Sequence, residues 1–291
     1  MRVFAVFLLV SLLAACATPP PPPPAPPVAV PKPPIKIALV LGGGAARGFA
    51  HIGVIKALEA QGIVPDIVVG TSAGSVVGAL YASGMSGFDL QKLALGMEED
   101  MLADWTMPNR GVLKGAALQD FINQKVKSQP IQKLPKPLGV VATDLLSGEM
   151  VLFRSGSTGI AVRASSAVPG VFQPVEINGR DYVDGGLTSP VPAQSARSMG
   201  ADFVIAVDIS NVGRRDKLTG TLDVLLQTFA IMGHTLSTHE LKDADVVIRP
   251  KTAAVSSTSF EDRHLAILEG EKAAAAIMPE LKARLQKSRA R

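Results

Sequence analysis

Three short motifs in the chain carry residue types that can perform acyl-transfer chemistry. In chain order they are the glycine cluster from Gly42 to Gly48, the Gly-x-Ser-x-Gly sequence from Gly70 to Gly74, and Asp184-Gly185-Gly186. A nucleophilic hydroxyl, a carboxylate able to take its proton and a loop of free amide groups are the parts that a covalent acyl-transfer site needs. Their order and setting therefore decide how far this chemistry can be assigned.

The glycine cluster reads Gly42-Gly43-Gly44-Ala45-Ala46-Arg47-Gly48 and lies between an expected strand and an expected helix. Successive glycines let backbone N–H groups converge on one point, and a helix N-terminus adds partial positive charge. Such a loop stabilises an anion, which is either a nucleotide phosphate or the oxyanion of an acyl-transfer intermediate. The cluster lacks the closing Gly-Lys-Ser/Thr of the phosphate-binding loop, which argues against a nucleotide-binding domain.

The second motif, Gly70-Thr71-Ser72-Ala73-Gly74, also lies between an expected strand and an expected helix. A Gly-x-Ser-x-Gly sequence at such a turn is the nucleophile elbow, in which the serine projects at the carboxyl edge of the sheet. The turn is so sharp that side chains at the flanking positions would clash, which explains Gly70 and Gly74. We therefore expect Ser72 to be a nucleophile, with the helix that begins at Ala73 directing its amides toward it.

A serine nucleophile needs a base, and a histidine near the end of the domain would be usual for many hydrolases. None of the later histidines follows a strand on a short loop, and one earlier histidine falls inside the helix after the glycine loop; they are His234, His239, His264 and His51. Their spacing does not match a zinc motif either. Asp184, directly after an expected strand, is the better partner, so a Ser72–Asp184 dyad is expected and no metal or cofactor.

Short apolar runs alternate with helical patterns from residue 35 onward. Asn178-Gly179 between two such runs predicts a hairpin. The expected strands cover residues 35–41, 66–69, 138–143, 150–153, 175–177, 181–183, 203–207 and 246–248, and the main expected helices cover 46–61, 73–82, 160–165, 222–241 and 263–291. This alternation predicts an α/β fold with a mostly parallel central sheet.

The first residues are typical of a secreted lipoprotein. A basic start and an apolar run end in Leu13-Ala14-Ala15-Cys16, which describes a signal peptide and resembles the bacterial lipobox, in which the cysteine is lipidated. Cys16 is the only cysteine, so it cannot form an intrachain disulfide. The proline-dense stretch behind it would be a spacer. We expect an anchor on Cys16 and, since Ala17 follows it, an outer-membrane location facing the periplasm.

Composition sets the broad class of the protein. Hydrophobic residues make up 47% of the 291 residues, which is enough for a buried core, and the formal charge is only +4. Lysines and arginines form no stripe with interleaved aromatics, so no nucleic-acid partner is expected. The expected segments are a signal peptide at 1–15, a lipidated linker at 16–34, a hydrolase domain at 35–250 and a helical C-terminal extension at 251–291.

Taken together, the motifs resemble the patatin-like phospholipases, and in particular the bacterial branch related to neuropathy target esterase. The resemblance runs from about residue 35 to 208 and also includes the stretch from Gly48 to Val54 and the Ala164-Ser165-Ser166-Ala167-x-Pro169-Gly170 stretch. It implies a three-layer α/β/α fold and cleavage of lipid esters, by attack of Ser72 with Asp184 as base.

The same resemblance implies the remaining site roles. The oxyanion hole would be formed by the glycine-loop amides of Gly42, Gly43 and Gly44 with that of Ala73, and Arg47 would support it. Two alternatives stay open: an esterase or thioesterase with a histidine base, and a catalytically silent lipid-binding or envelope regulatory lipoprotein. The sequence specifies neither the lipid, whether phospholipid or another ester, nor the oligomeric state.

Overall fold

The computed structural model describes residues 34–97, 112–210, 220–255 and 260–290. The expected signal peptide, Cys16 and the proline-rich stretch up to residue 33 lie outside the described residues, so they stay predictions. Among the helices that are described, none combines the length and the apolar character needed to cross a bilayer.

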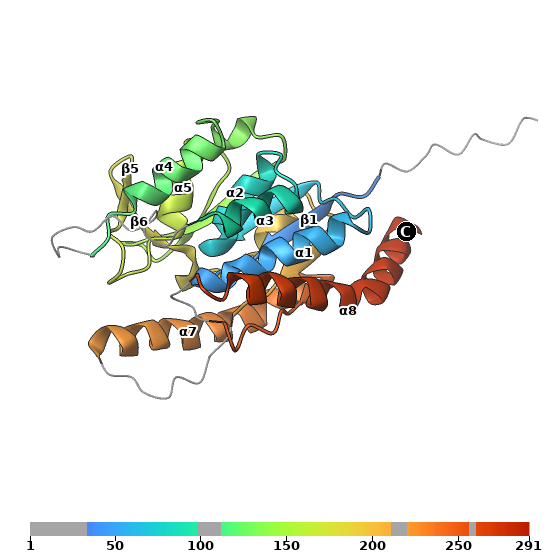
Figure 1. The fold of residues 1–291 in the computed structure, drawn as a ribbon. Coiled ribbons are helices and arrows are strands. Elements are labelled where there is room, and N and C mark those ends of the chain that lie inside the picture. Colours follow the sequence, from blue (N-terminus) through green and yellow to red (C-terminus); the bar gives the residue numbers. More distant parts are fainter. Residues whose placement is uncertain (1–33, 98–111, 211–219, 256–259, 291) are drawn as a thin grey trace, which may run out of the picture. The chain divides into compact units, whose positions relative to one another are not determined.

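The elements follow one another largely as the apolar pattern predicted (Figure 1). The strands are β1 (Ile37–Leu41), β2 (Ile67–Thr71), β3 (Leu138–Asp144), β4 (Met150–Phe153), β5 (Val175–Ile177), β6 (Arg180–Asp184), β7 (Phe203–Val207) and β8 (Val246–Ile248). The α-helices are α1 (Phe49–Glu59), α2 (Ala73–Ala82), α3 (Gly87–Leu95), α4 (Ala116–Lys125), α5 (Thr158–Ser165), α6 (Ala193–Ser198), α7 (Thr221–Glu240) and α8 (Arg263–Ala290). Short 3-10 turns include η1 (Ala45–Gly48), η4 (Gly185–Leu187) and η5 (Leu241–Asp243).

The strands form one mixed sheet in the order β5-β6-β3-β2-β1-β7-β8, and β4 pairs with β3 on the side opposite to β6. The pairs among β3, β2, β1, β7 and β8 are parallel, whereas β3–β4, β3–β6 and β5–β6 are antiparallel. The α/β class with a mostly parallel sheet is thus confirmed. The hairpin at Asn178-Gly179 is confirmed as well, because both residues have the positive φ (53° and 77°) that a two-residue hairpin turn requires.

The central strands are buried on both faces. In β1, Ile37, Leu39 and Leu41 belong to one core cluster, while the alternate residues Ala38 and Val40 belong to another. Side chains alternate across a strand, so these clusters are the two faces of the sheet. Helices α1, α2 and α8 contribute to the first cluster and α6 with η5 to the second. The three-layer α/β/α arrangement is therefore confirmed.

Helix α8 packs directly along α1 (Figure 1). A Cβ on Gly53 would lie only 1.9 Å from the Ile267 carbonyl oxygen, and a Cβ on Gly270 only 2.0 Å from that of Ala50. The two glycines let the backbones approach closely, and α8 residues such as Leu281 are fully buried in the main core. By their internal contacts, residues 34–291 form one compact unit. The expected boundary at residue 250 stays a prediction.

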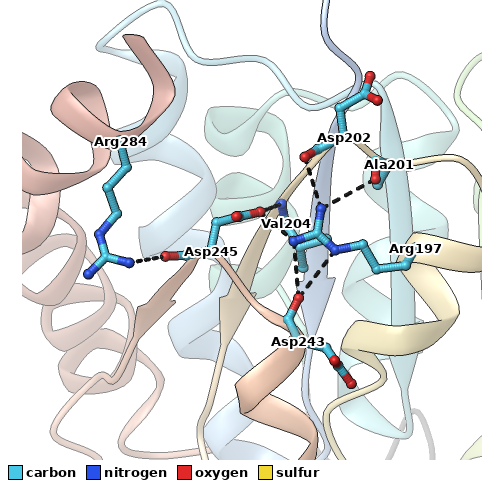
Figure 2. Close-up of polar contacts among 7 residues, drawn as sticks. All are labelled: Arg197, Ala201, Asp202, Val204, Asp243, Asp245 and Arg284. Atoms are coloured by element: carbon cyan, nitrogen blue, oxygen red, sulfur yellow. Dashed lines mark hydrogen bonds and ion pairs between the residues drawn. The ribbon is translucent and has the colours of Figure 1, made fainter. Parts of the chain in front are cut away.

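An arginine network joins the elements at the amino ends of β7 and β8 (Figure 2). The Arg197 guanidinium lies 2.6 Å from the Asp245 carboxylate and donates hydrogen bonds to the carbonyls of Asp202 and Asp243. Arg284 of α8 donates to the Asp245 carbonyl at 2.8 Å. These contacts lie at the amino ends of the parallel strands, whereas the glycine loop and Ser72 lie at the carboxyl ends.

Candidate active site

Ser72 occupies the single-residue junction between β2 and α2. Its backbone has φ 53° and ψ −125°, a left-handed conformation that is costly for a residue with a side chain. Such strain at a strand-to-helix turn is the geometry of a nucleophile elbow. Ser72 therefore has the backbone geometry expected of the elbow, and its role as nucleophile stays a prediction.

The glycines that flank Ser72 are required by close backbone contacts. A Cβ on Gly70 would lie 2.4 Å from the Gly74 carbonyl oxygen, and a Cβ on Gly74 would lie 2.0 Å from that of Leu41. Both distances are far below any ordinary contact, so the expected clash is confirmed. The start of α2 can approach β1 this closely only because Gly74 has no side chain.

Asp184 reaches Ser72 because of how the strands pair. The β2–β3 ladder ends with Thr71 opposite Val141, and β6 joins the sheet next to it with Asp184 opposite Ala142. Ala142 follows Val141 in β3, so Asp184 lies one residue further along β3 than Thr71, which directly precedes Ser72. The Ser72 hydroxyl donates to Asp184 Oδ2 at 2.7 Å.

The Asp184 carboxylate is buried, with a second partner on its other oxygen. Asp184 Oδ1 accepts the Gly186 N–H at 2.7 Å, the first amide hydrogen bond of the η4 turn. Burial raises the pKa of Asp184 to about 6, although the hydrogen bonds from Ser72 and Gly186 oppose the shift. A carboxylate with that pKa is suited to accept a proton near neutral pH.

All four histidines are in the described part of the chain, and no hydrogen bond joins any of them to Ser72 or Asp184. His51 Nε2 donates to the Gly42 carbonyl at 2.8 Å, and burial lowers the pKa of His51 to about 4. A neutral ring therefore holds the glycine loop against α1.

The glycine loop offers fewer free amides than expected. The Gly42 N–H donates to a carbonyl of β7 and the Gly43 N–H to the Pro190 carbonyl, each at 3.0 Å. The expectation that Gly42 and Gly43 supply oxyanion donors is therefore corrected, because both amides already donate to backbone carbonyls. Among the described residues, the amides of Gly44 and Ala73 have no such partner.

The remainder of the loop is held against the start of α2. Arg47 Nε donates to the Gly44 carbonyl at 3.1 Å, which stabilises the turn around the Gly44 amide. A Cβ on Gly48 would lie 2.7 Å from the Ala73 Cβ, so this glycine permits the close packing. The loop therefore packs against Ala73, which follows Ser72, and a Cβ on Gly43 would lie 3.4 Å from the Ser72 Cβ.

Two further side chains hold the elbow, and sequence reasoning gave them no role. Ser165 Oγ, at the end of α5, accepts the Ser72 N–H at 2.8 Å. Thr71 Oγ1 donates to the Ser189 carbonyl at 2.8 Å. The sequence signal for Ser165 is its place in the Ala164–Ala167 stretch, which belongs to the family resemblance. No local pattern indicates the Thr71 contact.

The described residues contain no group of three or more histidine, cysteine, aspartate or glutamate side chains able to hold a metal ion. The chemistry that the arrangement supports through its own groups is nucleophilic: a strained serine, a buried base at hydrogen-bond distance and two amides facing no other partner.

Comparisons with known proteins identify the family of the chain. A family model described as "Patatin-like phospholipase" matches residues 39–197, which include the glycine loop, the elbow and Asp184. An uncharacterized NTE family protein of Mycobacterium tuberculosis is 39% identical over 177 residues, 60% of this chain and 49% of that protein. Human patatin-like phospholipase domain-containing protein 6 is 39% identical over 191 residues, 63% of this chain and 14% of that protein. The chain thus spans about half or less of the length of these relatives.

Among solved structures, VipD from Legionella pneumophila superposes with a TM-score of 0.61 over 85% of this chain and 67% of that chain. Its sequence identity is 17%, so this likeness shows the fold. The family model covers more than half of the 291 residues. The chain belongs to the patatin-like phospholipase family.

Proposed function

We propose that the protein is a serine lipid acyl hydrolase that cleaves carboxylic esters through an acyl-enzyme on Ser72, with Asp184 as the base. The observation that carries the proposal is the 2.7 Å hydrogen bond from the Ser72 hydroxyl to Asp184 Oδ2 at a strained strand-to-helix turn. Family membership supports a lipid ester as the substrate class.

The proposed reaction has two halves. Ser72 Oγ attacks the ester carbonyl while Asp184 takes the hydroxyl proton, and the amides of Gly44 and Ala73 donate to the oxyanion. Asp184 returns the proton to the departing alcohol, which leaves an acyl group on Ser72. Water then attacks this ester with Asp184 again as base, and the fatty acid is released. Positioned general-base catalysis contributes about 10²–10⁴ in rate, and one oxyanion donor about 10²–10³.

Exposed aliphatic side chains on two elements, the turn after β3 and helix α7, support a lipid substrate. Strand β3 continues past the end of β2, and the turn after it exposes Leu146 to 89%. Helix α7 passes the dyad, since a Cβ on Gly233 would lie 3.9 Å from the Gly186 carbonyl oxygen. Its exposed apolar residues are Leu222, Val224, Leu225, Ile231 and Met232. Aliphatic groups around an active site suit substrates presented by a lipid surface.

The location follows as part of the same proposal. A lipid anchor on Cys16, followed by a proline-rich spacer, would keep the enzyme at the periplasmic face of the outer membrane, beside its substrate. Metabolic labelling with an alkyne fatty acid tests the anchor, and a Cys16→Ser variant that still incorporates the label would contradict it.

Fluorophosphonate labelling of the full-length protein tests the dyad. We expect labelling and turnover of a short-chain ester in the wild type, and neither in Ser72→Ala or Asp184→Asn. Ser198→Ala removes an exposed hydroxyl of α6 and serves as the matched control, which should behave as wild type. Equal labelling of Asp184→Asn and wild type would favour a histidine base. A folded wild type that takes no label would favour a lipid-binding protein without catalysis.

A further inference from the structure

The residues from Ser189 to Val191, here called the 189–191 strap, connect the parts of the site that flank Ser72. The Ser189 carbonyl accepts the Thr71 hydroxyl at 2.8 Å, and Thr71 directly precedes Ser72. The next carbonyl, that of Pro190, accepts the Gly43 N–H at 3.0 Å. One short segment therefore sets the position of both the elbow and the glycine loop.

The strap is also joined to the turn that follows the base. The Ser189 N–H donates to the Gly185 carbonyl at 2.8 Å, and Gly185 follows Asp184 directly. All three neighbours of the reacting atoms, namely the elbow, the loop and the base turn, thus meet at the strap. A shift of the strap would displace them together.

One side chain outside these elements holds the strap. Glu240, the last residue of α7, accepts the Val191 N–H at 2.7 Å and the Ser189 hydroxyl on its other carboxylate oxygen. The strap itself is buried, with Val191 fully inaccessible. A carboxylate is a strong double acceptor, and charge-assisted hydrogen bonds are about twice as strong as neutral ones. Each oxygen of Glu240 is matched to one donor of the strap.

We propose that Glu240 is a positioning residue for the hydrolytic site: by clamping the 189–191 strap, it fixes Thr71 and Gly43 around Ser72. Glu240 bonds to neither Ser72 nor Asp184, so it acts through the strap and not on the substrate. The inference rests on the proposed function for its catalytic consequence.

A merely structural role makes a different prediction. Helix α7 has a single buried residue, Ser237, so Glu240 also anchors the end of a thinly packed helix. If anchoring were its whole role, loss of the carboxylate would lower stability and leave the kinetics of the folded protein unchanged. If the clamp positions the site, kcat falls while KM stays nearly constant, because substrate binding to other parts is untouched.

The kinetic test uses full-length Glu240→Ala and Glu240→Gln, with Glu176→Gln on the exposed face of β5 as the matched control. The glutamine variant keeps one acceptor and can still bridge both partners, whereas alanine keeps none. We expect Glu240→Ala to lower kcat for a soluble ester, and the rate of fluorophosphonate labelling, by roughly 10–100-fold, as misplacement of reacting groups by about an ångström does. Glu240→Gln should recover most of the loss, and Glu176→Gln should match wild type.

A second measurement is independent of catalysis. Amide hydrogen exchange at Gly43 reports the bond to the Pro190 carbonyl, and we expect it to accelerate at least tenfold in Glu240→Ala but not in Glu176→Gln. Unchanged exchange at Gly43, or an unchanged kcat in folded Glu240→Ala, overturns the proposal. If Glu240→Ala does not fold, Ser189→Ala, which removes one of the two donors to Glu240, should show the same two changes in smaller size, with Glu240→Gln as the variant expected to stay near wild type. Absence of labelling in wild type refutes the proposed function alone, because the exchange experiment still tests the clamp.

Discussion

The buried carboxylate of Asp184, the proposed base, gives a prediction in which loss of activity accompanies a gain of stability. Asp184 is ionised at neutral pH, and its pKa is raised from 3.8 to about 6 because burial disfavours the charge. Asp184→Asn has nearly the same shape and keeps an oxygen for the Gly186 N–H and an amide group for Ser72. The asparagine resembles the protonated carboxyl at every pH. The variant therefore loses both the free-energy cost of burying a charged carboxylate and the proposed base.

The size of the effect follows from linkage between protonation and folding. A folded-state pKa above the unfolded value contributes stability that is present below the unfolded pKa and is lost as pH rises through the folded pKa. The shift of about two units corresponds to about 3 kcal/mol at 1.36 kcal/mol per unit. We expect Asp184→Asn to be more stable than wild type by about that amount above pH 6, and by almost nothing near pH 4.

The assay is urea unfolding of both proteins at a series of pH values, with thermal melts as a check. A difference of about 3 kcal/mol corresponds to a rise in Tm of roughly 6–12 °C for a domain of this size. Other titrating groups cancel, because only the difference between the two proteins is used. Asp120→Asn, an exposed change on α4, should show no difference. A variant that is less stable than wild type at neutral pH, or a difference that does not vanish on acidification, would refute the reasoning.

Three further predictions use the same geometry. Below a pKa of about 6, kcat/KM for a soluble ester should fall tenfold per pH unit as Asp184 becomes protonated, and a profile that stays flat to about pH 4.5 would exclude it as the base. Gly74→Ala places a Cβ 2.0 Å from the Leu41 carbonyl oxygen and should lower the free energy of unfolding by about 3 kcal/mol, whereas Gly96→Ala, whose nearest contacts are 3.7 Å away, serves as control in the same urea titration. Leu146→Ser should lower hydrolysis of vesicle lipid more than hydrolysis of a soluble ester, because it removes an exposed aliphatic contact; equal effects on both substrates would contradict a role at the lipid surface.

Features that depend on neighbouring residues were predictable from the sequence. The hairpin turn has positive φ at Asn178 and Gly179, and the pair Asn-Gly by itself predicts such a turn. The elbow around Ser72 and the clash that excludes side chains at Gly74 follow from one strand-to-helix junction in the same way. The strand and helix alternation also sufficed for the α/β class.

Features that depend on the order of strands were not predictable at this level. Nothing in the spacing shows that β6 pairs with β3 beyond the end of β2, although this pairing brings Asp184 to Ser72. The docking of α8 on α1 was missed because the small residues that permit it, such as Gly270, look like ordinary helix residues in the chain. The engagement of the Gly43 amide by Pro190 was missed for a similar reason, since its partner lies 147 residues later.

The separation of the two residues of the proposed dyad along the chain has a consequence for folding. Ser72 and Asp184 are 112 positions apart, and they meet only through the ladder from β2 to β3 to β6. An early intermediate that has formed only the β1–α1–β2–α2 portion would hold a serine without its base. Contacts between distant segments form slowly because the connecting chain must first be closed. Refolding chains should therefore become reactive to a fluorophosphonate only as fast as β6 pairs with β3. The rate at which this reactivity appears would then measure the last stage of folding.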